Sequence, residues 1–448
     1  MSNVNLFLLS GVYILLLLIY IIYFIKKTKY NEDTPTYNGF LLGLIFFYII
    51  MPILILLNID SLNSIEINAG KYNSGTFQRF IINGEWQNFA YSILMIILAI
   101  LMFVVFYRKS SYNNSNRGYT FNANKTYKIV KNIMYITFGA GLVSLLIFFA
   151  SFGGIGRALS YAEQMRSMSN DLEEIIGSMA LFKVLARLIT VTPFFAIYLI
   201  SENKEPDKKN IYKIFLIISL LGSVLFYLYN AGRAPIILFA LCFIYVFLNK
   251  YIKNTWTFLI LIGMFCLPML DILDSLFVFF NTGEFRFKEI NYVKYIYQFA
   301  IPYKNTLVLN NINNEFGLRW GKDFVTAIID LLPKINFDPV YCDLSLFIRG
   351  ENWKELGGIP SDFITFSHMQ FSFIGVIAFS GIIGYFMQII DYKLSLFENE
   401  RMKKLFGCVL TVFSFFIITS FDIATIIRGQ FILIAVIFII LVSSKRRK

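Results

Sequence analysis

Several Lys and Arg residues of this sequence lie within or next to apolar segments, where they could bind an anionic ligand. Lys183 and Arg187 are four residues apart, so they share one face of an expected helix. Arg233 stands in a short turn between two apolar segments, and Arg166 lies in an expected loop helix. A cation in the apolar zone of a bilayer costs about 2.5–3.5 kcal/mol, so it tends to face a cavity or a partner. The four predict a site for a lipid diphosphate, and snorkelling to lipid headgroups is the alternative interpretation.

Two residues could move a proton. His368 is the only histidine of the chain, and Asp362 precedes it by six residues. Either side chain could act as general base on a substrate hydroxyl, while packing or hydrogen bonding is the alternative for His368. With one His, four Cys and no tightly spaced acidic motif, we expect neither a metal nor another cofactor.

The composition requires a membrane. Hydrophobic residues make up 57% of the 448 positions and charged residues 15%, and the mean hydropathy is +0.64. A soluble domain has about 45–50% apolar and about 25% charged residues. The net charge of +12 follows the loops rather than one basic run, so we do not expect a nucleic-acid partner.

Apolar segments of helix-spanning length predict an all-α polytopic integral membrane protein with about 11 transmembrane helices. The first segment shows no small-residue cleavage site, so we interpret it as a span rather than a signal peptide. The predicted spans lie at about 6–25, 39–57, 89–107, 132–151, 179–200, 211–229, 234–249, 256–278, 369–391, 405–421 and 428–444.

The charges of the connecting segments predict the orientation. One alternating set of loops and tails carries 23 Lys and Arg, and the short segments of the opposite set carry 6. Because basic loops stay in the cytoplasm, the C-terminal tail is predicted inside. The long loop 279–368 is predicted outside, between the N-terminal spans of 1–278 and the C-terminal spans of 369–448.

Within the long loop, residues 319–335 (RWGKDFVTAIIDLLPKI) have apolar positions at helical spacing. This segment is predicted to lie along the membrane surface as an interfacial helix. Arg319 and Lys334, near its two ends, complete the set of candidate phosphate-binding residues.

A motif follows this segment. Residues 357–364 read GGIPSDFI, and Phe371 and Ile374-Gly375-Val376-Ile377 come next. The stretch resembles the Wzy-type oligosaccharide repeat-unit polymerases, which make O-antigen and capsular polysaccharides. It departs from that pattern where Phe366 replaces an acid, His368 an aromatic, and Gln370 and Ser372 replace Asn and Gly. A loop that opens with Gly153-Gly154, the Gly232-Arg233 turn and the Leu332-Pro333-Lys334 element also resemble the family.

The resemblance implies a GT-C-like fold and a metal-independent glycosyl transfer at the outer leaflet of the bacterial cytoplasmic membrane. A growing glycan would leave undecaprenyl diphosphate and join a hydroxyl of a new lipid-linked repeat unit. A chain-length regulator and a flippase of the same pathway would be partners. An O-antigen ligase or another lipid-linked-sugar glycosyltransferase is the nearest alternative. A transporter of lipid-linked oligosaccharide is the alternative from another class.

Overall fold

The computed structural model describes residues 11–20, 34–58, 86–115, 119–121, 123–161, 173–230, 233–248, 299–329, 339–350, 358–397 and 399–446, with isolated residues between 269 and 296. The chain folds into two compact units, each built from segments that are far apart in the sequence. The first unit comprises Met1–Asn116, Asn291–Asp391 and Ser414–Ile427. The second comprises Arg117–Ile290, Tyr392–Phe413 and Arg428–Lys448.

The described residues contain seven helices that are long and apolar enough to cross a membrane, in agreement with a polytopic membrane protein. They confirm seven of the predicted spans as helices. Shorter helices mark three further predicted spans, and the span predicted at 256–278 lies largely outside the described residues. The seven are Pro35–Leu57, Gln87–Lys109, Ala123–Ser151, Leu181–Glu202, Pro206–Tyr229, Phe363–Ser395 and Met402–Thr419.

Helix α11 (Lys209–Tyr229) shows the distribution of side chains that lipid imposes. Ile217 and Leu221 are 58% and 63% exposed, whereas Ser219 and Ser223 are fully buried. The Ser223 hydroxyl donates to the carbonyl of Ser219, so the polar group is satisfied inside the protein. Apolar side chains outside and small polar ones inside are what a helix needs in hydrocarbon.

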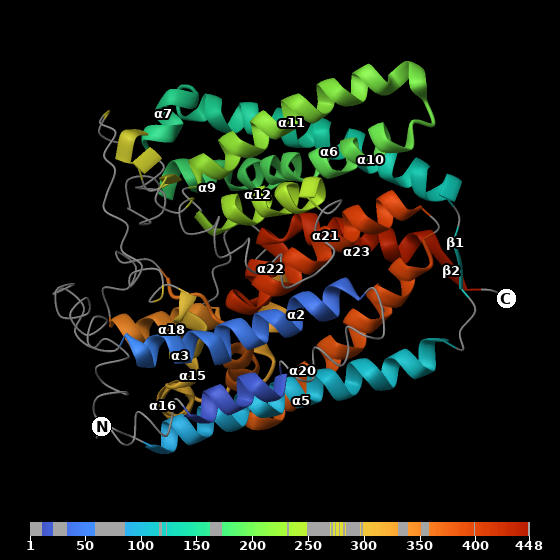
Figure 1. Ribbon diagram of the computed structural model, residues 1–448. Helices are drawn as coiled ribbons and strands as arrows, with labels where there is room; N and C mark the ends of the chain where they lie inside the picture. The colour runs from blue at the N-terminus through green and yellow to red at the C-terminus, as the bar shows by residue number, and fades with distance from the viewer. Residues whose placement is uncertain are drawn as a thin grey trace. The chain divides into compact units, whose positions relative to one another are not determined.

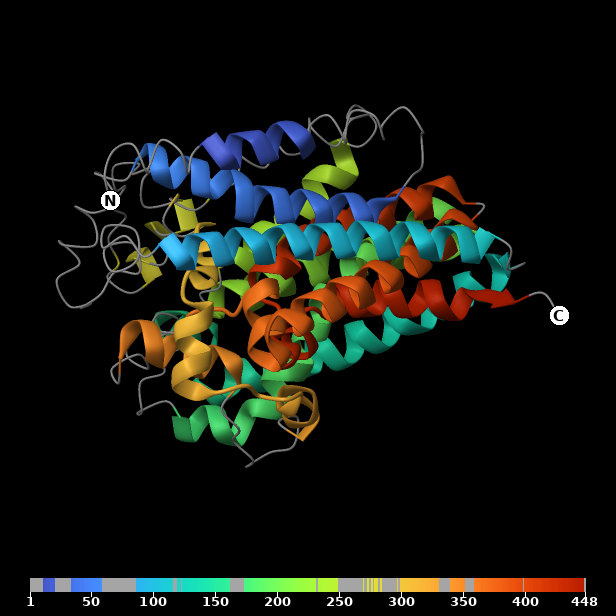
Figure 2. The same cartoon turned by 90° about the horizontal axis from the view of Figure 1, so that it is seen from below.

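In the first unit, α2, α5 and α20 lie side by side (Figures 1 and 2). A Cβ atom at Gly384 of α20 would lie 2.5 Å from the Phe103 carbonyl oxygen of α5, so the close approach requires glycine. The helices of this unit are α2 (Pro35–Ile45), η1 (Phe46–Ile50), α3 (Met51–Leu57), α5 (Trp86–Ser115), α15 (Ile301–Thr306), α16 (Leu309–Phe316), α17 (Lys322–Ile329), α18 (Val340–Arg349), most of α20 (Phe363–Ser395), η6 (Ile417–Thr419) and most of α22 (Ile423–Gly429).

In the second unit, α6 packs against α9, η4 and α10, and α11 packs against α10 (Figure 1). Besides α11, this unit contains β1 (Tyr119–Phe121), α6 (Ala123–Ser151), α7 (Ile155–Ser160), α9 (Glu173–Ala186), η4 (Arg187–Thr190), α10 (Thr192–Glu202), η5 (Pro206–Lys208), α12 (Arg233–Leu248), most of α21 (Glu400–Phe416), α23 (Phe431–Ser443) and β2 (Ser444–Arg446).

The two short strands are an addition to the expected all-helical fold. Strand β1 pairs antiparallel with β2, so that Thr120 lies opposite Lys445. Nearby in sequence, Lys131 forms an ion pair of 2.6 Å with Glu205. These contacts join three segments that the charge count assigns to the cytoplasmic side. They support its grouping of the loops, and which side of the membrane they face stays a prediction.

The predicted division into 1–278, 279–368 and 369–448 follows the order of the chain, and it stays a prediction. The two compact units are interleaved instead, since each one takes residues from the N-terminal and the C-terminal part. The long-loop segment between residues 299 and 329 contributes short helices to the first unit.

Candidate functional site

Helix α20, which follows the GGIP turn, is broken near its start. Phe371 (φ −143°, ψ 28°) and Ser372 (φ 55°, ψ −147°) leave helical geometry and divide it into segments 363–370 and 373–395. A Cβ atom at Gly375 would lie 2.0 Å from the Ser367 carbonyl oxygen, so glycine alone admits this doubling back. The helix therefore begins at Phe363 rather than at residue 369. Its first segment, 363–370, is a separate short helix that carries polar side chains, and we call it the platform.

His368 lies on this platform and is 1% exposed. The Tyr91 hydroxyl of α5 lies 2.6 Å from its Nε2. The Asn313 amide nitrogen of α16 donates to its Nδ1 at 3.0 Å. With Nδ1 as acceptor, the neutral ring carries its proton on Nε2 and donates it to the Tyr91 oxygen. The imidazole is thus oriented from both sides, and the half-buried Tyr91 is its link to the surroundings.

Asp362 has the contacts of a helix cap. Its Oδ1 accepts the backbone N–H groups of Ile364 and Thr365, each at 3.1 Å, and the Tyr48 hydroxyl. Its Oδ2 accepts the Asn305 amide at 3.0 Å. The carboxyl is fully buried, and burial raises its pKa despite these hydrogen bonds. The role of Asp362 as a base stays a prediction, and its contacts favour holding the start of α20.

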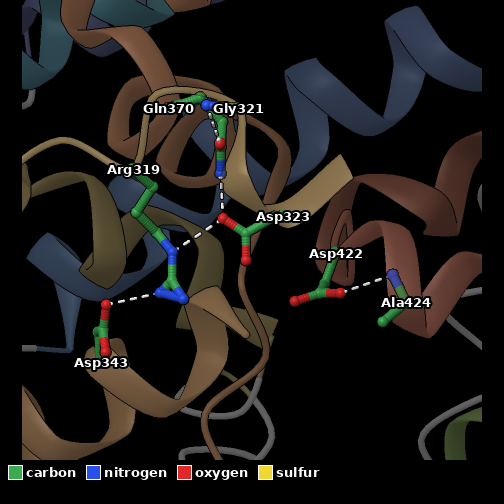
Figure 3. Close-up of polar contacts among 7 residues, drawn as sticks. All are labelled: Arg319, Gly321, Asp323, Asp343, Gln370, Asp422 and Ala424. Atoms are coloured by element: carbon green, nitrogen blue, oxygen red, sulfur yellow. Dashed lines mark hydrogen bonds and ion pairs between the residues drawn. The ribbon is translucent and has the colours of Figure 1, made fainter. Parts of the chain in front are cut away.

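Arg319 belongs to a buried ion-pair network (Figure 3). Its Nε donates to Asp323 Oδ2 at 2.8 Å, and one terminal nitrogen donates to Asp343 at 2.7 Å. The Gln370 amide also donates to Asp323 Oδ2 at 2.7 Å, and its oxygen accepts the Gly321 N–H at 3.1 Å. The network ties the loop before α17 to the end of the first α20 segment. Two carboxylates oppose the Arg319 charge, which disfavours a contact between Arg319 and a phosphate, and its role in phosphate binding stays a prediction.

The second unit brings predicted cations together. The Lys183 ammonium lies 5.9 Å from the centre of the Tyr229 ring, and the Arg187 guanidinium 5.6 Å from that of Phe226. Both rings belong to the last turn of α11, and α12 begins four residues after Tyr229, at Arg233. Arg233 thus comes shortly after Phe226 and Tyr229 in the sequence, and these are the two rings that Arg187 and Lys183 contact. The Arg233 side chain itself is outside the described part of the structure.

Other sequence-based candidates are not described. Arg166 and Lys334 lie outside the described residues. Within the described part of the chain, His, Cys, Asp and Glu side chains form no group of three or more that could hold a metal ion.

Sequence reasoning missed most of the partners in these clusters. Asp323 could have been found, because it stands four residues after Arg319 on the predicted interfacial helix. Tyr91 and Asn313 gave no local signal, since they lie 277 and 55 residues from His368 along the chain. Asp422 follows the tenth predicted span and drew no attention as a lone loop acid.

Comparisons with known proteins identify no relative: no protein-family model, no curated protein and no solved structure matches this chain.

Proposed function

We propose that this chain is a glycosyltransferase that joins undecaprenyl-diphosphate-linked oligosaccharide repeat units at the outer leaflet of the bacterial cytoplasmic membrane. The observation that carries the proposal is the oriented imidazole of His368. His368 comes four residues after the motif 357–364 that resembles the Wzy-type polymerases, on a helix that is broken at Phe371 and Ser372. The described apolar helices supply the membrane setting that a lipid-linked substrate needs, and a GT-C-like arrangement of them is part of the proposal.

The acceptor hydroxyl requires a base, and Tyr91 with His368 can provide one. The Asn313 amide oxygen is buried without a partner, so a half-turn of the amide would present oxygen instead of nitrogen to Nδ1. The ring proton then moves to Nδ1, and Nε2 becomes an acceptor for the Tyr91 hydroxyl. As the acceptor hydroxyl loses its proton to the Tyr91 oxygen, the phenol passes its own proton to Nε2.

The leaving group requires positive charge. Lys183 and Arg187 sit beside the end of α11, and Arg233 begins the next helix. We propose that these residues of the second unit, together with Arg166, bind the diphosphate of the lipid-linked substrate. An ammonium and a guanidinium can do so without a metal ion, by charge-assisted hydrogen bonds to phosphate oxygens.

The first experiment compares cell-surface glycan length in the parent strain, a strain lacking the chain, and strains with Tyr91→Phe or His368→Gln at matched membrane levels. We expect the deletion strain to keep single repeat units and to lose the polymer. Loss of general-base catalysis lowers a rate by about 10²–10⁴-fold, so both variants should give much shorter glycans. Tyr385→Phe is the matched control, because Tyr385 is an exposed tyrosine of α20 that lacks a histidine contact among the described residues.

Two results would count against the proposal. Full-length polymer in Tyr91→Phe and His368→Gln would exclude the proton path. Loss of all exported repeat units in the deletion strain would favour a transporter of lipid-linked oligosaccharide instead.

A second experiment addresses the leaving group through Arg233. A bidentate guanidinium contact is lost in Arg233→Ala and weakened in Arg233→Lys, because Lys lacks the planar fork. A charge-assisted hydrogen bond contributes about 1.5–3 kcal/mol, so turnover should fall by about tenfold to more than a hundredfold in Arg233→Ala. Equal turnover in wild type and both variants would assign Arg233 to anchoring at lipid headgroups.

A further inference from the structure

Two buried carboxylates of the first unit each have one oxygen without a partner. Asp323 and Asp422 are 3% and 2% exposed. Asp323 Oδ1 and Asp422 Oδ2 lack hydrogen-bond partners, whereas the other oxygen of each is occupied. In Figure 3 the free oxygen of Asp422 is the one nearer Asp323, and the charge of Asp323 acts on Asp422. A buried acceptor that lacks a donor lowers stability, so this arrangement calls for a donor.

Among the described residues, the positive charge beside these acids is limited. Arg319 is shared between Asp323 and Asp343, and Asp422 Oδ1 accepts the backbone N–H groups of Ala424 at 2.8 Å and Thr425 at 3.3 Å. Burial raises the pKa of Asp422, and the neighbouring charge of Asp323 adds to the rise. The two carboxylates therefore have acceptor capacity and negative charge that their described neighbours do not satisfy. A ligand with hydrogen-bond donors or positive charge would satisfy both.

A third polar group belongs to the same neighbourhood. The Ser361 hydroxyl is buried and lacks a partner, and the Ser361 carbonyl accepts the N–H of Phe421 at 2.8 Å. Ser361 thus adjoins the residue that precedes Asp422. The unpaired groups gather where the GGIP turn meets the loop after η6.

Helix α17 lies within the segment that is predicted to lie along the membrane surface, and the exposure of its side chains bears on that position. Asp323 and Thr326 of α17 are buried, while Val325 and the preceding Trp320 are 60% and 70% exposed. A helix with its polar side inward and its apolar side outward fits lipid rather than water. This orientation supports the predicted interfacial position of the segment. The headgroup of a lipid-linked substrate lies at the same depth.

We propose that Asp323 Oδ1 and Asp422 Oδ2 bind hydroxyl or ammonium donors of the lipid-linked saccharide. The identity of the ligand rests on the function proposed above. A divalent cation fits less well, because it needs six or more oxygen ligands and the described residues form no such group. Saccharides present several donors at once, and two carboxylate oxygens with a buried hydroxyl match them.

The test measures binding to the purified full-length protein in detergent. The probe is the fluorescently labelled glycan released by mild acid from the lipid-linked pool of a strain lacking the chain. Asp422→Asn keeps the oxygen that caps α22 and replaces the free oxygen by an amide donor. Asp422→Ser is the second variant, since serine also caps helices but removes the free oxygen. Ser380→Ala is the matched control, because it removes a buried unpartnered hydroxyl from the second segment of α20.

We expect Asp422→Asn and Asp422→Ser to bind the glycan about 10- to 100-fold more weakly than wild type, the loss expected for one charge-assisted hydrogen bond. Ser380→Ala should bind like wild type. Wild-type affinity in both Asp422 variants, or no binding to wild type, would overturn the inference. Full-length polymer in a strain lacking the chain would instead overturn the polymerase, while Asp422-dependent binding would still establish a saccharide site.

Discussion

Substitutions of Asp362 can distinguish a helix cap from a general base. The carboxylate accepts four hydrogen bonds in a fully buried position, from Tyr48, Asn305 and the N–H groups of Ile364 and Thr365. Asp362→Ala removes the acceptor of the Thr365 N–H and of the Tyr48 hydroxyl. The Asn305 amide keeps the Pro360 carbonyl at 3.0 Å, and the Ile364 N–H keeps the Tyr48 oxygen at 3.4 Å. Each unsatisfied group costs about 1–3 kcal/mol, so these two groups give about 2–6 kcal/mol of lost stability.

Asp362→Asn should be milder. The amide oxygen can take the place of Oδ1 and keep the two backbone N–H groups and Tyr48, so the cap at the start of α20 survives. The amide nitrogen then faces the donor of Asn305, and one charge-assisted hydrogen bond is lost. We expect a loss of about 1.5–3 kcal/mol.

The assay is unfolding of the purified protein in increasing dodecyl sulfate, alongside glycan elongation in cells at matched membrane levels. If Asp362 acts as a cap, Asp362→Asn elongates glycans and Asp362→Ala fails because it unfolds. Tyr48→Phe, which removes one of the four donors, is the graded control. The reasoning is refuted if Asp362→Asn is as stable as wild type but elongates about 100-fold more slowly, since that pattern belongs to a general base.

Three further predictions concern the fold. Gly375→Ala places a Cβ atom 2.0 Å from a backbone oxygen, so we expect a loss of more than about 3 kcal/mol in the same unfolding assay; wild-type stability would contradict the broken helix. Hydrogen bonding to Lys131 lowers the pKa of Glu205 to about 2. The small contribution of this partly exposed pair, about 0.5 kcal/mol, should therefore persist above pH 4.5 and disappear as the pH falls towards 2. The stability difference between wild type and Glu205→Gln should therefore disappear over the same pH range. In a Cys-less background, Trp320→Cys should react with an impermeant thiol reagent from outside and Lys204→Cys only after permeabilisation; the reverse pattern would invert the topology.

Much of the transmembrane architecture could be predicted from local sequence. A run of about twenty apolar residues has one low-energy solution in hydrocarbon, a helix that satisfies its own backbone. Seven predicted spans accordingly appear as long apolar helices. The break at Phe371 and Ser372 could not be predicted, because the apolar pattern continues across it and glycine at residue 375 allows the chain to fold back.

Single residues of the candidate site could be found from the sequence, but their contacts could not, as His368 and Arg319 show. His368 drew attention as the single imidazole, but its partners Tyr91 and Asn313 come from other helices. Arg319 was expected to face phosphate, yet Asp323 and Asp343 take up its guanidinium in the structure. A charged residue has the same local pattern whether its partner is a ligand or a distant side chain.

The sequence by itself determined that the chain forms apolar helices of membrane-spanning length, because hydropathy acts over one segment at a time. The grouping of its basic loops stays a prediction. Only the tertiary structure decided which polar groups are satisfied. That depends on helices brought together from distant parts of the chain, as with His368, Tyr91 and Asn313. The same packing left Asp323 and Asp422 each with an unpaired oxygen, since a buried carboxylate needs donors that only its neighbours or a ligand can provide.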